Sequence, residues 1–225
     1  DHAFFATMYK FAEQYGVNYI LTGGNLSTEC VRNPIEWMYY QSDSVQLCDI
    51  HKKFGNRKLV SYPITNILKH KIYLPYIKGI KVIRPLDNIH YIKKEALKLL
   101  VEEFDWQTYP QKHFESRFTK FYEGYWLPTR FGFDTRKVQF SSLILTGQMT
   151  RGDALEKLKD PAYDPEMIEH DFEYVATKLG ISVNDLQKLM DLPKQTYKDY
   201  KSQQSIYNLG AFLLKRLGLE VGGKR

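Results

Sequence analysis

The chain has 225 residues, of which 43% are hydrophobic and 26% charged, and its 32 Lys and Arg residues against 26 Asp and Glu give a formal net charge of +6. This composition supplies a normal hydrophobic core, so it excludes disordered and collagen-like chains. No apolar run approaches the ~18 residues of a membrane-spanning helix, and we therefore predict no membrane span.

The N-terminal residues alternate between helix and strand. Asp1 is a favourable N-cap for a helix through about Tyr15, which Gly16 ends. The predicted inward stripe of this helix is Phe4, Phe5, Met8, Phe11 and Ala12. An apolar strand over residues 19–22, of the fully buried kind found in parallel sheets, leads into the polar loop 23–29. This order predicts a late piece of an α/β sheet.

The middle of the chain continues with short elements of both kinds. The pattern predicts a loop or short helix over 34–41, a helix over 44–54 closed by Gly55, a strand over 58–64, a helix over 68–76 interrupted by Pro75, a strand over 81–86, and a helix over 89–104 with Ile92, Ala96, Leu99 and Leu100 inward. Helices dominate from Ser141 on. Their predicted starts and ends are Thr150 with Asp153 to 158, Asp164-Pro165 to Gly180, Ser182 with Asp185, and a last helix over 205–217.

Two stretches hold side chains suited to ligand binding. Gly23 and Gly24 follow the first strand, where ligands approach in open parallel sheets, and Asn25, Ser27 and Glu29 add polar groups. A purely structural turn is the competing interpretation. If residues 113–125 are helical, one face carries the side chains of His113, Arg117 and Lys120, with Ser116 beside them. Such a stripe suits an anionic ligand, although it is also typical of a solvated helix face.

Charge is unevenly distributed along the chain. Residues 51–84 contain nine basic and no acidic residues, and the last 32 residues contain seven basic and two acidic ones. Acidic stretches elsewhere balance most of this excess, which favours a small, multiply anionic ligand over a polyanion such as nucleic acid. Cys30 and Cys48 have no metal-ligand spacing, so we predict no metal site and two reduced thiols in a cytoplasmic protein.

Several blocks resemble the N-acetyl sugar amidotransferase family, the lipopolysaccharide and surface-glycan enzymes of the ATP-pyrophosphatase-loop superfamily. The most specific are Lys112-His113-Phe114-Glu115-Ser116-Arg117-Phe118-Thr119-Lys120-Phe121 and Leu143-Ile144-Leu145-Thr146-Gly147-Gln148-Met149-Thr150-Arg151. Asp1-His2-Ala3, Tyr19-Ile20-Leu21-Thr22-Gly23-Gly24-Asn25 and residues 50–55 add to the resemblance. It implies the late part of an open parallel-sheet, HUP-like nucleotide-binding domain over residues 1–106, followed by a mainly helical substrate or partner region over 107–225.

The resemblance also implies a reaction. ATP, with Mg, adenylylates the oxygen of an acetamido group on a nucleotide-linked diacetamido uronic acid. Ammonia then replaces AMP to form an acetamidino group. The implied partner is a glutaminase of the histidine-biosynthesis type with its cyclase-like barrel, because this chain has no Cys-His arrangement of its own for releasing ammonia.

Each site residue inherits a role from the resemblance. His113 and Glu115 orient ammonia or move protons, and residues 23–25, Ser27 and Glu29 face the nucleotide. The implied substrate-binding residues are Ser116, Arg117, Lys120, Arg130, Arg136, Ser141 and Ser142.

The family's N-terminal Ser-Gly-Gly-x-Asp-Ser phosphate loop, and the cysteine cluster before it that implies zinc, do not occur in these residues. We therefore expect the chain to be the C-terminal part of a longer protein and, made alone, to lack ATP-dependent activity. Two alternatives stay open. One is a tRNA-modifying enzyme of the same superfamily, and the other is a non-catalytic scaffold that docks a glutaminase.

Overall fold

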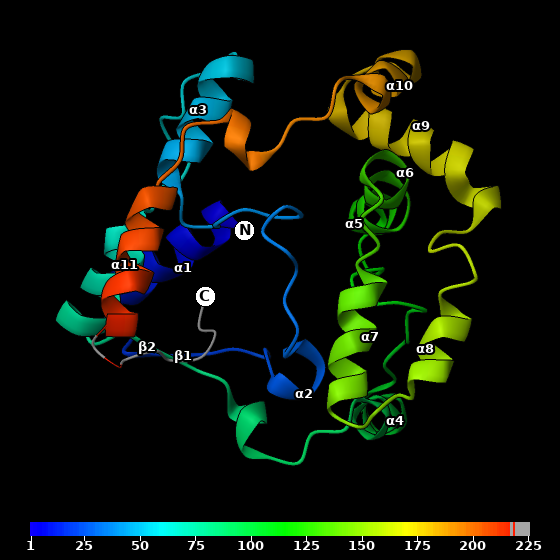
Figure 1. Ribbon diagram of the computed structural model, residues 1–225, viewed down its shortest axis with the longest axis horizontal. Coiled ribbons are helices and arrows are strands. Elements are labelled where there is room, and N and C mark those ends of the chain that lie inside the picture. The colour runs from blue at the N-terminus through cyan, green and yellow to red at the C-terminus, as the bar shows by residue number, and fades with distance from the viewer. Residues whose placement is uncertain (217, 219–225) are drawn as a thin grey trace. The chain divides into compact units, whose positions relative to one another are not determined.

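The computed structural model describes residues 1–216 and 218 (Figure 1). The chain forms two compact units. The first comprises Asp1–Ile20, Met38–Ile83 and the residues from Gln195 on, and the second comprises Leu21–Trp37 and Arg84–Lys194. The units do not divide the chain at the expected boundary between residues 106 and 107. The assignment of residues 1–106 to a nucleotide-binding domain stays a prediction.

The first unit combines three longer helices with a small sheet. Its elements are α1 (His2–Gln14), β1 (Tyr19–Leu21), α3 (Ser44–Phe54), the π-helix η1 (Lys69–Ile77), β2 (Lys81–Ile83), the 3₁₀ turn η5 (Tyr197–Asp199) and α11 (Gln204–Arg216). Leu21, the last residue of β1, already belongs to the second unit. The structure confirms the predicted helices α1, α3 and α11.

The buried face of helix α1 agrees with the predicted one for Ala12, Phe5 and Met8, and the prediction was wrong for Phe4 and Phe11. Asp1 is its N-cap, and Gly16 adopts the left-handed conformation (φ +65°) expected after a helix end. Its buried residues are Ala6, Tyr9 and Ala12, whereas Phe4 and Phe11 are exposed. The buried face is set by the partners, because Tyr9 and Ala12 pack in one cluster with two buried residues, Leu74 and Ile80.

The sheet of the described residues is a pair of three-residue strands, β1 and β2. Both ends of β1 are exposed, so the prediction of a fully buried strand was wrong for Tyr19 and Leu21. A two-stranded sheet has few neighbours to cover its faces, and the apolar run alone could not reveal that. The predicted strand over 58–64 was also wrong, since these residues form bends and loop.

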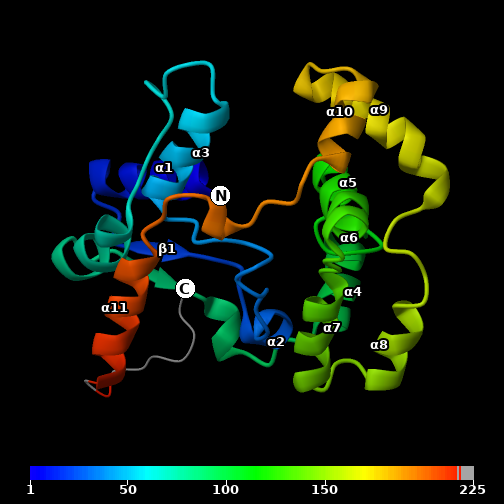
Figure 2. The ribbon, with the colours of Figure 1, turned by 45° about the horizontal axis from the view of Figure 1, so that its top comes forward.

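The second unit is almost entirely helical. Its elements are α2 (Leu26–Glu29), the 3₁₀ turn η2 (Pro85–Asn88), α4 (Lys93–Phe104), α5 (Arg117–Phe121), the π-helix η3 (Tyr122–Trp126), α6 (Leu127–Phe131), α7 (Arg136–Leu145), α8 (Arg151–Lys157), the 3₁₀ turn η4 (Pro165–Met167), α9 (Ile168–Leu179) and α10 (Val183–Asp191). Helix α2 packs against α7 (Figure 1), and α9 packs against α10 and α5 (Figure 2).

Local signals located several of these helices correctly. Thr150 and Asp153 form a reciprocal capping box at the start of α8, and the Ser182 side chain accepts from the Asp185 backbone N–H at the start of α10. Gly180 ends α9 in the left-handed conformation. Helix α4 begins later than predicted, and the prediction of an inward apolar stripe was wrong for Leu99 and Leu100, which are exposed, whereas Ile92 and Ala96 are partly buried.

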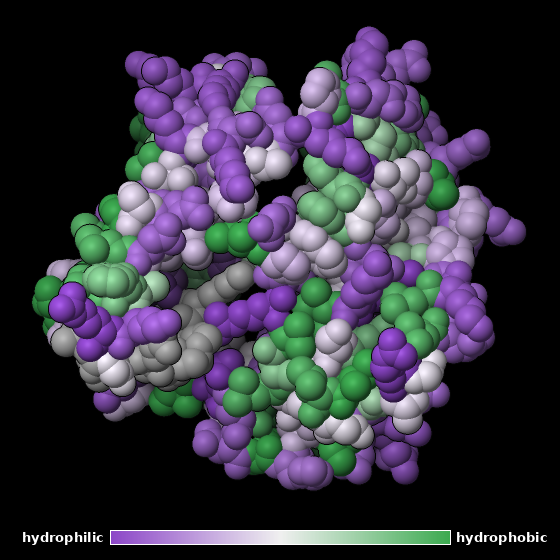
Figure 3. Space-filling view, viewed as in Figure 1, coloured by the Kyte–Doolittle hydropathy of each residue, from purple (hydrophilic) through white to green (hydrophobic). Residues whose placement is uncertain are grey.

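One aromatic and aliphatic cluster forms the main core of the second unit. Its buried members are Phe121, Tyr163, Phe172, Val175, Ala176 and Leu186. Apolar side chains also remain at the surface of the units, where they are visible as green areas in Figure 3. The described residues are thus mostly helical, in agreement with the predicted helical region. None of their helices has the length and apolarity needed to cross a bilayer.

Candidate binding pocket

The second unit contains a cavity of about 1020 Å³ that is rich in basic side chains. It is lined by the segment around α2, by the residues that precede α5, by α7 and by the loop that follows α8. Its charged lining residues are Lys93, Lys112, Lys120, Arg136 and Lys157 against Glu29, Asp160 and Asp164. Apolar lining residues include Phe114, Phe140, Leu143 and Met149. A cavity of this size, with an excess of cations, can accommodate a large anionic ligand.

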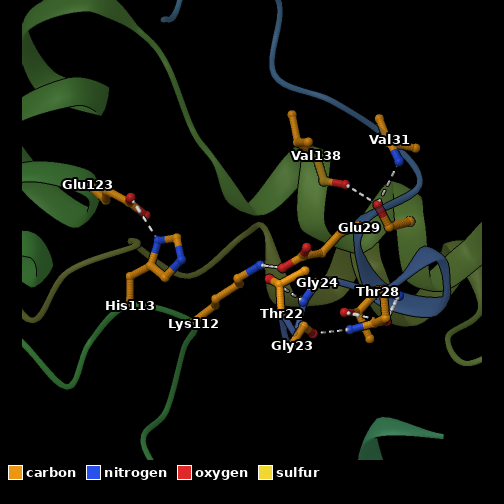
Figure 4. A network of polar contacts seen from close by, with 12 residues as sticks. Thr22, Gly23, Gly24, Thr28, Glu29, Val31, Lys112, His113, Glu123 and Val138 are labelled. Carbon is orange, nitrogen blue, oxygen red and sulfur yellow. Dashed lines mark hydrogen bonds and ion pairs between the residues drawn. The ribbon is translucent and has the colours of Figure 1, made fainter. Parts of the chain in front are cut away.

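The predicted nucleotide-facing loop lies at one side of this cavity and is held by its own hydrogen bonds (Figure 4). The buried Asn25 side chain caps α2, accepting from the Thr28 backbone N–H at 2.9 Å, and its amide donates to the Gly23 carbonyl at 3.3 Å. The Gly24 N–H donates to Thr22 Oγ1 at 3.3 Å. Asn25 and Glu29 line the cavity, but Gly23, Gly24 and Ser27 do not. The Asn25 amide therefore has a structural role.

Ser27 and Ser142 connect α2 to α7. The Ser27 carbonyl accepts from Thr146 Oγ1 at 2.7 Å and from Gln148 Nε2 at 3.2 Å. The buried Ser142 hydroxyl accepts from the Val31 N–H at 3.0 Å and donates to the Val138 carbonyl at 3.3 Å. These two serines fix the packing of the pocket wall, and neither lines the cavity.

Glu29 and Lys112 form an ion pair at the pocket, with the Lys112 ammonium donating to Glu29 Oε1 (Figure 4). The Lys112 side chain is 32% exposed and that of Glu29 is 40% exposed. Because both are partly exposed, the pair is weakened by solvent and can be opened by a competing ligand.

His113 lies outside the helix in which the sequence placed it. Its φ of +70° is left-handed, and α5 begins only at Arg117, after Ser116 caps it by accepting from the Thr119 N–H at 3.3 Å. The predicted single stripe of His113, Arg117 and Lys120 was therefore wrong. Ser116 interrupts the expected helix because a serine hydroxyl competes for free N–H groups at helix starts.

The His113 ring instead faces Glu123 (Figure 4). Its Nδ1 lies 2.9 Å from Glu123 Oε1, and this hydrogen bond, opposed by burial, raises the pKa of His113. The exposed Glu115 adds a smaller electrostatic contribution in the same direction. Neither His113 nor Glu115 lines the cavity, so their predicted role in proton transfer stays a prediction.

Arg117 and Lys120 do converge, on a carboxylate that the sequence analysis missed. Asp171 is fully buried and accepts from Arg117 Nε and from the Tyr163 hydroxyl, while Lys120 Nζ lies 3.7 Å away. The Arg117 guanidinium also stacks on the Tyr174 ring, 4.0 Å from its centroid. Lys120 lines the cavity, whereas Arg117 does not.

The electrostatics of Asp171 follow from these partners. Burial alone would raise the pKa of Asp171, but hydrogen bonds from Tyr163 and Arg117 and the charges of Arg117 and Lys120 outweigh it, so the pKa is lowered. A signal was present in the sequence, because Asp171 falls on the same helical face as Ile168 and Val175. A carboxylate on an apolar stripe indicates a buried ion pair.

The two remaining predicted arginines are saturated by protein acceptors. Arg130 donates to the carbonyls of Leu189, Met190 and Leu192 at the end of α10, the last at 2.9 Å. Arg136 is 7% exposed and binds the Asp134 carboxylate through Nε and Nη2 at 3.0 and 2.8 Å. Arg136 also donates to the carbonyls of residues 157 and 160. Their contribution to substrate binding stays a prediction, as does that of Ser141, whose hydroxyl donates to the Lys137 carbonyl.

Lys93 and Gln111 line the cavity, although the sequence did not single them out. Burial, with a smaller effect from the nearby Lys112 charge, lowers the pKa of Lys93. Gln111 Nε2 is buried and has no hydrogen-bond partner within residues 1–216 and 218. The two residues escaped notice because Lys93 lies in a segment of net negative charge and Gln111 carries no charge.

Among residues 1–216 and 218, no three His, Cys, Asp or Glu side chains are placed to hold a metal ion. Cys30 and Cys48 are free thiols, and the Cys30 thiol donates to the Ser142 carbonyl at 3.7 Å.

Comparison with known proteins connects the C-terminal half to a family. Residues 115–214 match the model of the C-terminal domain of WbpG-like lipopolysaccharide biosynthesis proteins. No curated protein and no solved structure matches the chain. The match covers less than half of the chain. It supports the predicted relationship to proteins of lipopolysaccharide biosynthesis.

Proposed function

We propose that the chain acts in lipopolysaccharide biosynthesis as the substrate-binding part of an ATP-dependent amidotransferase. Its substrate would be a nucleotide-linked diacetamido uronic acid, one acetamido group of which becomes an acetamidino group with ammonia from a partner glutaminase. The family match over residues 115–214 supports the pathway. The basic pocket of the second unit is the observation that carries the choice of substrate.

The pocket matches the chemistry of such a substrate in charge and size. Five cationic side chains line it against three carboxylates. A sugar nucleotide of this class carries a diphosphate and a carboxylate, and cations attract both groups. The apolar lining residues, Phe114 and Phe140 among them, provide surface for the sugar and base.

Lys120 is the predicted substrate-binding residue whose placement fits best. Asp171 at 3.7 Å and the Tyr163 ring, whose centroid lies 5.0 Å from Nζ, hold its ammonium at the cavity wall. A ligand anion would thus meet a charge that is already positioned, which reduces the entropy lost on binding. His113 would act from outside the cavity lining. Glu123 keeps it protonated to a higher pH than an isolated histidine.

The Gly23–Glu29 segment fits the nucleotide in one respect. A Cβ atom built on Gly23 would meet nothing within 4 Å, so a phosphate has room to approach that backbone. The Asn25 amide is instead used within the α2 cap. ATP, when bound, supplies the adenylyl group that makes the acetamido oxygen a leaving group.

Isothermal titration with a UDP-linked diacetamido uronic acid tests the proposal on this chain. We expect saturable binding that weakens with salt and that Lys120→Gln reduces. Lys188→Gln, on the exposed face of α10, removes the same charge outside the pocket and should bind as the wild type does. Absence of binding at millimolar ligand would refute the proposed substrate.

The reaction is tested in the organism that carries the gene. Mass spectrometry of its surface glycan after gene deletion should find oxygen in place of NH at one acetamidino group. An unchanged glycan would contradict the amidotransferase reaction.

A further inference from the structure

The cationic side chains that line the pocket differ in whether a carboxylate pairs with them. Arg136 is paired with Asp134, and Lys120 has the buried Asp171 nearby. Lys93 is half-buried, and within the described residues no carboxylate pairs with its ammonium. In the part of the chain that the structure describes, the lining lysines without a paired carboxylate are thus Lys93, which is half-buried, and Lys157, which is exposed.

The positive charge of Lys112 acts on the Lys93 ammonium. Burial and the Lys112 charge together lower the pKa of Lys93. Two ammonium groups held near each other in a partly buried wall repel one another and lose hydration. An anion placed between them would relieve both costs.

A further donor of the same wall is the side-chain amide of Gln111. Gln111 is adjacent to Lys112 in the chain, and its buried Nε2 has no hydrogen-bond partner among the residues that the structure describes. A buried amide donor left unsatisfied costs about 1–3 kcal/mol, so such a group is usually paired with a ligand or water. A cavity lined by this amide and by the two lysines suits a ligand with several acceptor oxygens and more than one negative charge.

We propose that Lys93, Gln111 and Lys112 form a diphosphate-binding subsite in which Glu29 occupies Lys112 until the anion displaces it. A diphosphate offers oxygens in several directions, which three donors from separate positions require, whereas a single carboxylate offers two. Lysine binds phosphate as a point charge and tolerates this variety of directions. The naming of the sugar nucleotide as the source of the diphosphate rests on the proposed function.

Titration calorimetry at low ionic strength tests the subsite with inorganic pyrophosphate and UDP as probes. We expect both probes to bind, and Lys93→Gln or Lys112→Gln to weaken binding about tenfold or more, as for the loss of a charged hydrogen bond. Lys94→Gln is the matched control, because Lys94 is exposed and lies outside the lining. Equal binding by the Lys93 and Lys94 variants, or no binding of either probe at millimolar concentration, overturns the subsite.

Glu29→Gln gives a test with the opposite sign. Loss of the Glu29 charge frees Lys112, so pyrophosphate should bind several-fold more tightly to this variant. A damaged fold cannot produce such a gain. Unchanged or weaker binding overturns the role of Glu29 as a competitor.

Nucleotide probes identify the source of the diphosphate. Tighter binding of UDP than of UMP, with a Lys93-dependent difference, supports a sugar nucleotide. Binding of ATP in the absence of UDP binding overturns that source.

The subsite and the proposed function can fail separately. Lys93-dependent pyrophosphate binding without binding of the diacetamido sugar nucleotide supports the subsite and refutes the function. Binding of the sugar nucleotide that neither lysine variant changes supports the proposed function and refutes the subsite.

Discussion

Asp171→Asn removes the fully buried charge that pairs with Arg117 and Lys120, and we expect it to destabilise the second unit by about 3 kcal/mol. Breaking a buried ion pair costs about 3–5 kcal/mol when one partner is removed. The lower end applies here, because the side chains of Arg117 and Lys120 are 34% and 25% exposed and water can solvate them. The substituted side chain would also present an amide donor toward either Arg117 or the Tyr163 hydroxyl, where two carboxylate oxygens now accept.

Tryptophan fluorescence during urea unfolding measures the stability of the second unit. All three tryptophans of the chain, Trp37, Trp106 and Trp126, belong to the second unit. With a urea dependence of about 2 kcal/mol/M, the midpoint should fall by about 1.5 M.

Glu173→Gln is the matched control for Asp171→Asn. Glu173 is an exposed carboxylate on the same helix, so its substitution should change stability by about 0.5 kcal/mol or less. A loss below about 1 kcal/mol for Asp171→Asn, or an equal loss for Glu173→Gln, would refute the assignment of a stabilising buried network.

The pH dependence provides an independent check on Asp171. Its pKa is lowered in the folded protein, so the unfolded state binds a proton first as the pH falls. The stability contributed by this carboxylate is complete above its ordinary pKa and is lost as the pH falls through the folded-state pKa. The difference in the free energy of unfolding between the wild type and Asp171→Asn should therefore decrease toward low pH. A difference that stays constant to the lowest pH would contradict the charge-based explanation.

Three further perturbations test other parts of the chain. Gly124→Ala would place a Cβ 2.8 Å from Tyr163 Cδ2, so we expect a loss of about 1–3 kcal/mol in urea unfolding followed by tryptophan fluorescence; unchanged stability would show that the site can relax. Burial, with a smaller effect from a neighbouring lysine, lowers the pKa of His70 to about 4, so acidification from pH 7 protonates only the unfolded state. Lowering the pH to about 4 should then reduce the free energy of unfolding, measured by circular dichroism, by about 3 kcal/mol. His70→Gln should lose most of this pH dependence, and equal acid sensitivity of the two proteins would count against the explanation. Thr150→Ala breaks the capping box with Asp153, which should cost about 1 kcal/mol and reduce amide-exchange protection in α8, and unaltered exchange would show that the cap contributes nothing there.

Features that depend on a few neighbouring residues could be predicted from the amino-acid sequence. The capping box of α8 and the left-handed Gly180 after α9 were both predictable, because their hydrogen bonds and backbone angles involve residues within a turn of each other. The charge mosaic likewise indicated a small anionic ligand, and the pocket agrees with that indication in its excess of cations.

Which of the charged side chains remain available to a ligand depends on packing between distant segments and could not be predicted from the sequence. Arg117, Arg130 and Arg136 looked alike in the sequence, yet each is bound by a carboxylate or carbonyls from distant segments. Lys93 and Gln111, which no motif marked, line the pocket with no carboxylate at the ammonium of the first and no acceptor at the amide of the second within residues 1–216 and 218. Burial and charge pairing depend on groups that are far apart along the chain, and only packing brings those groups together.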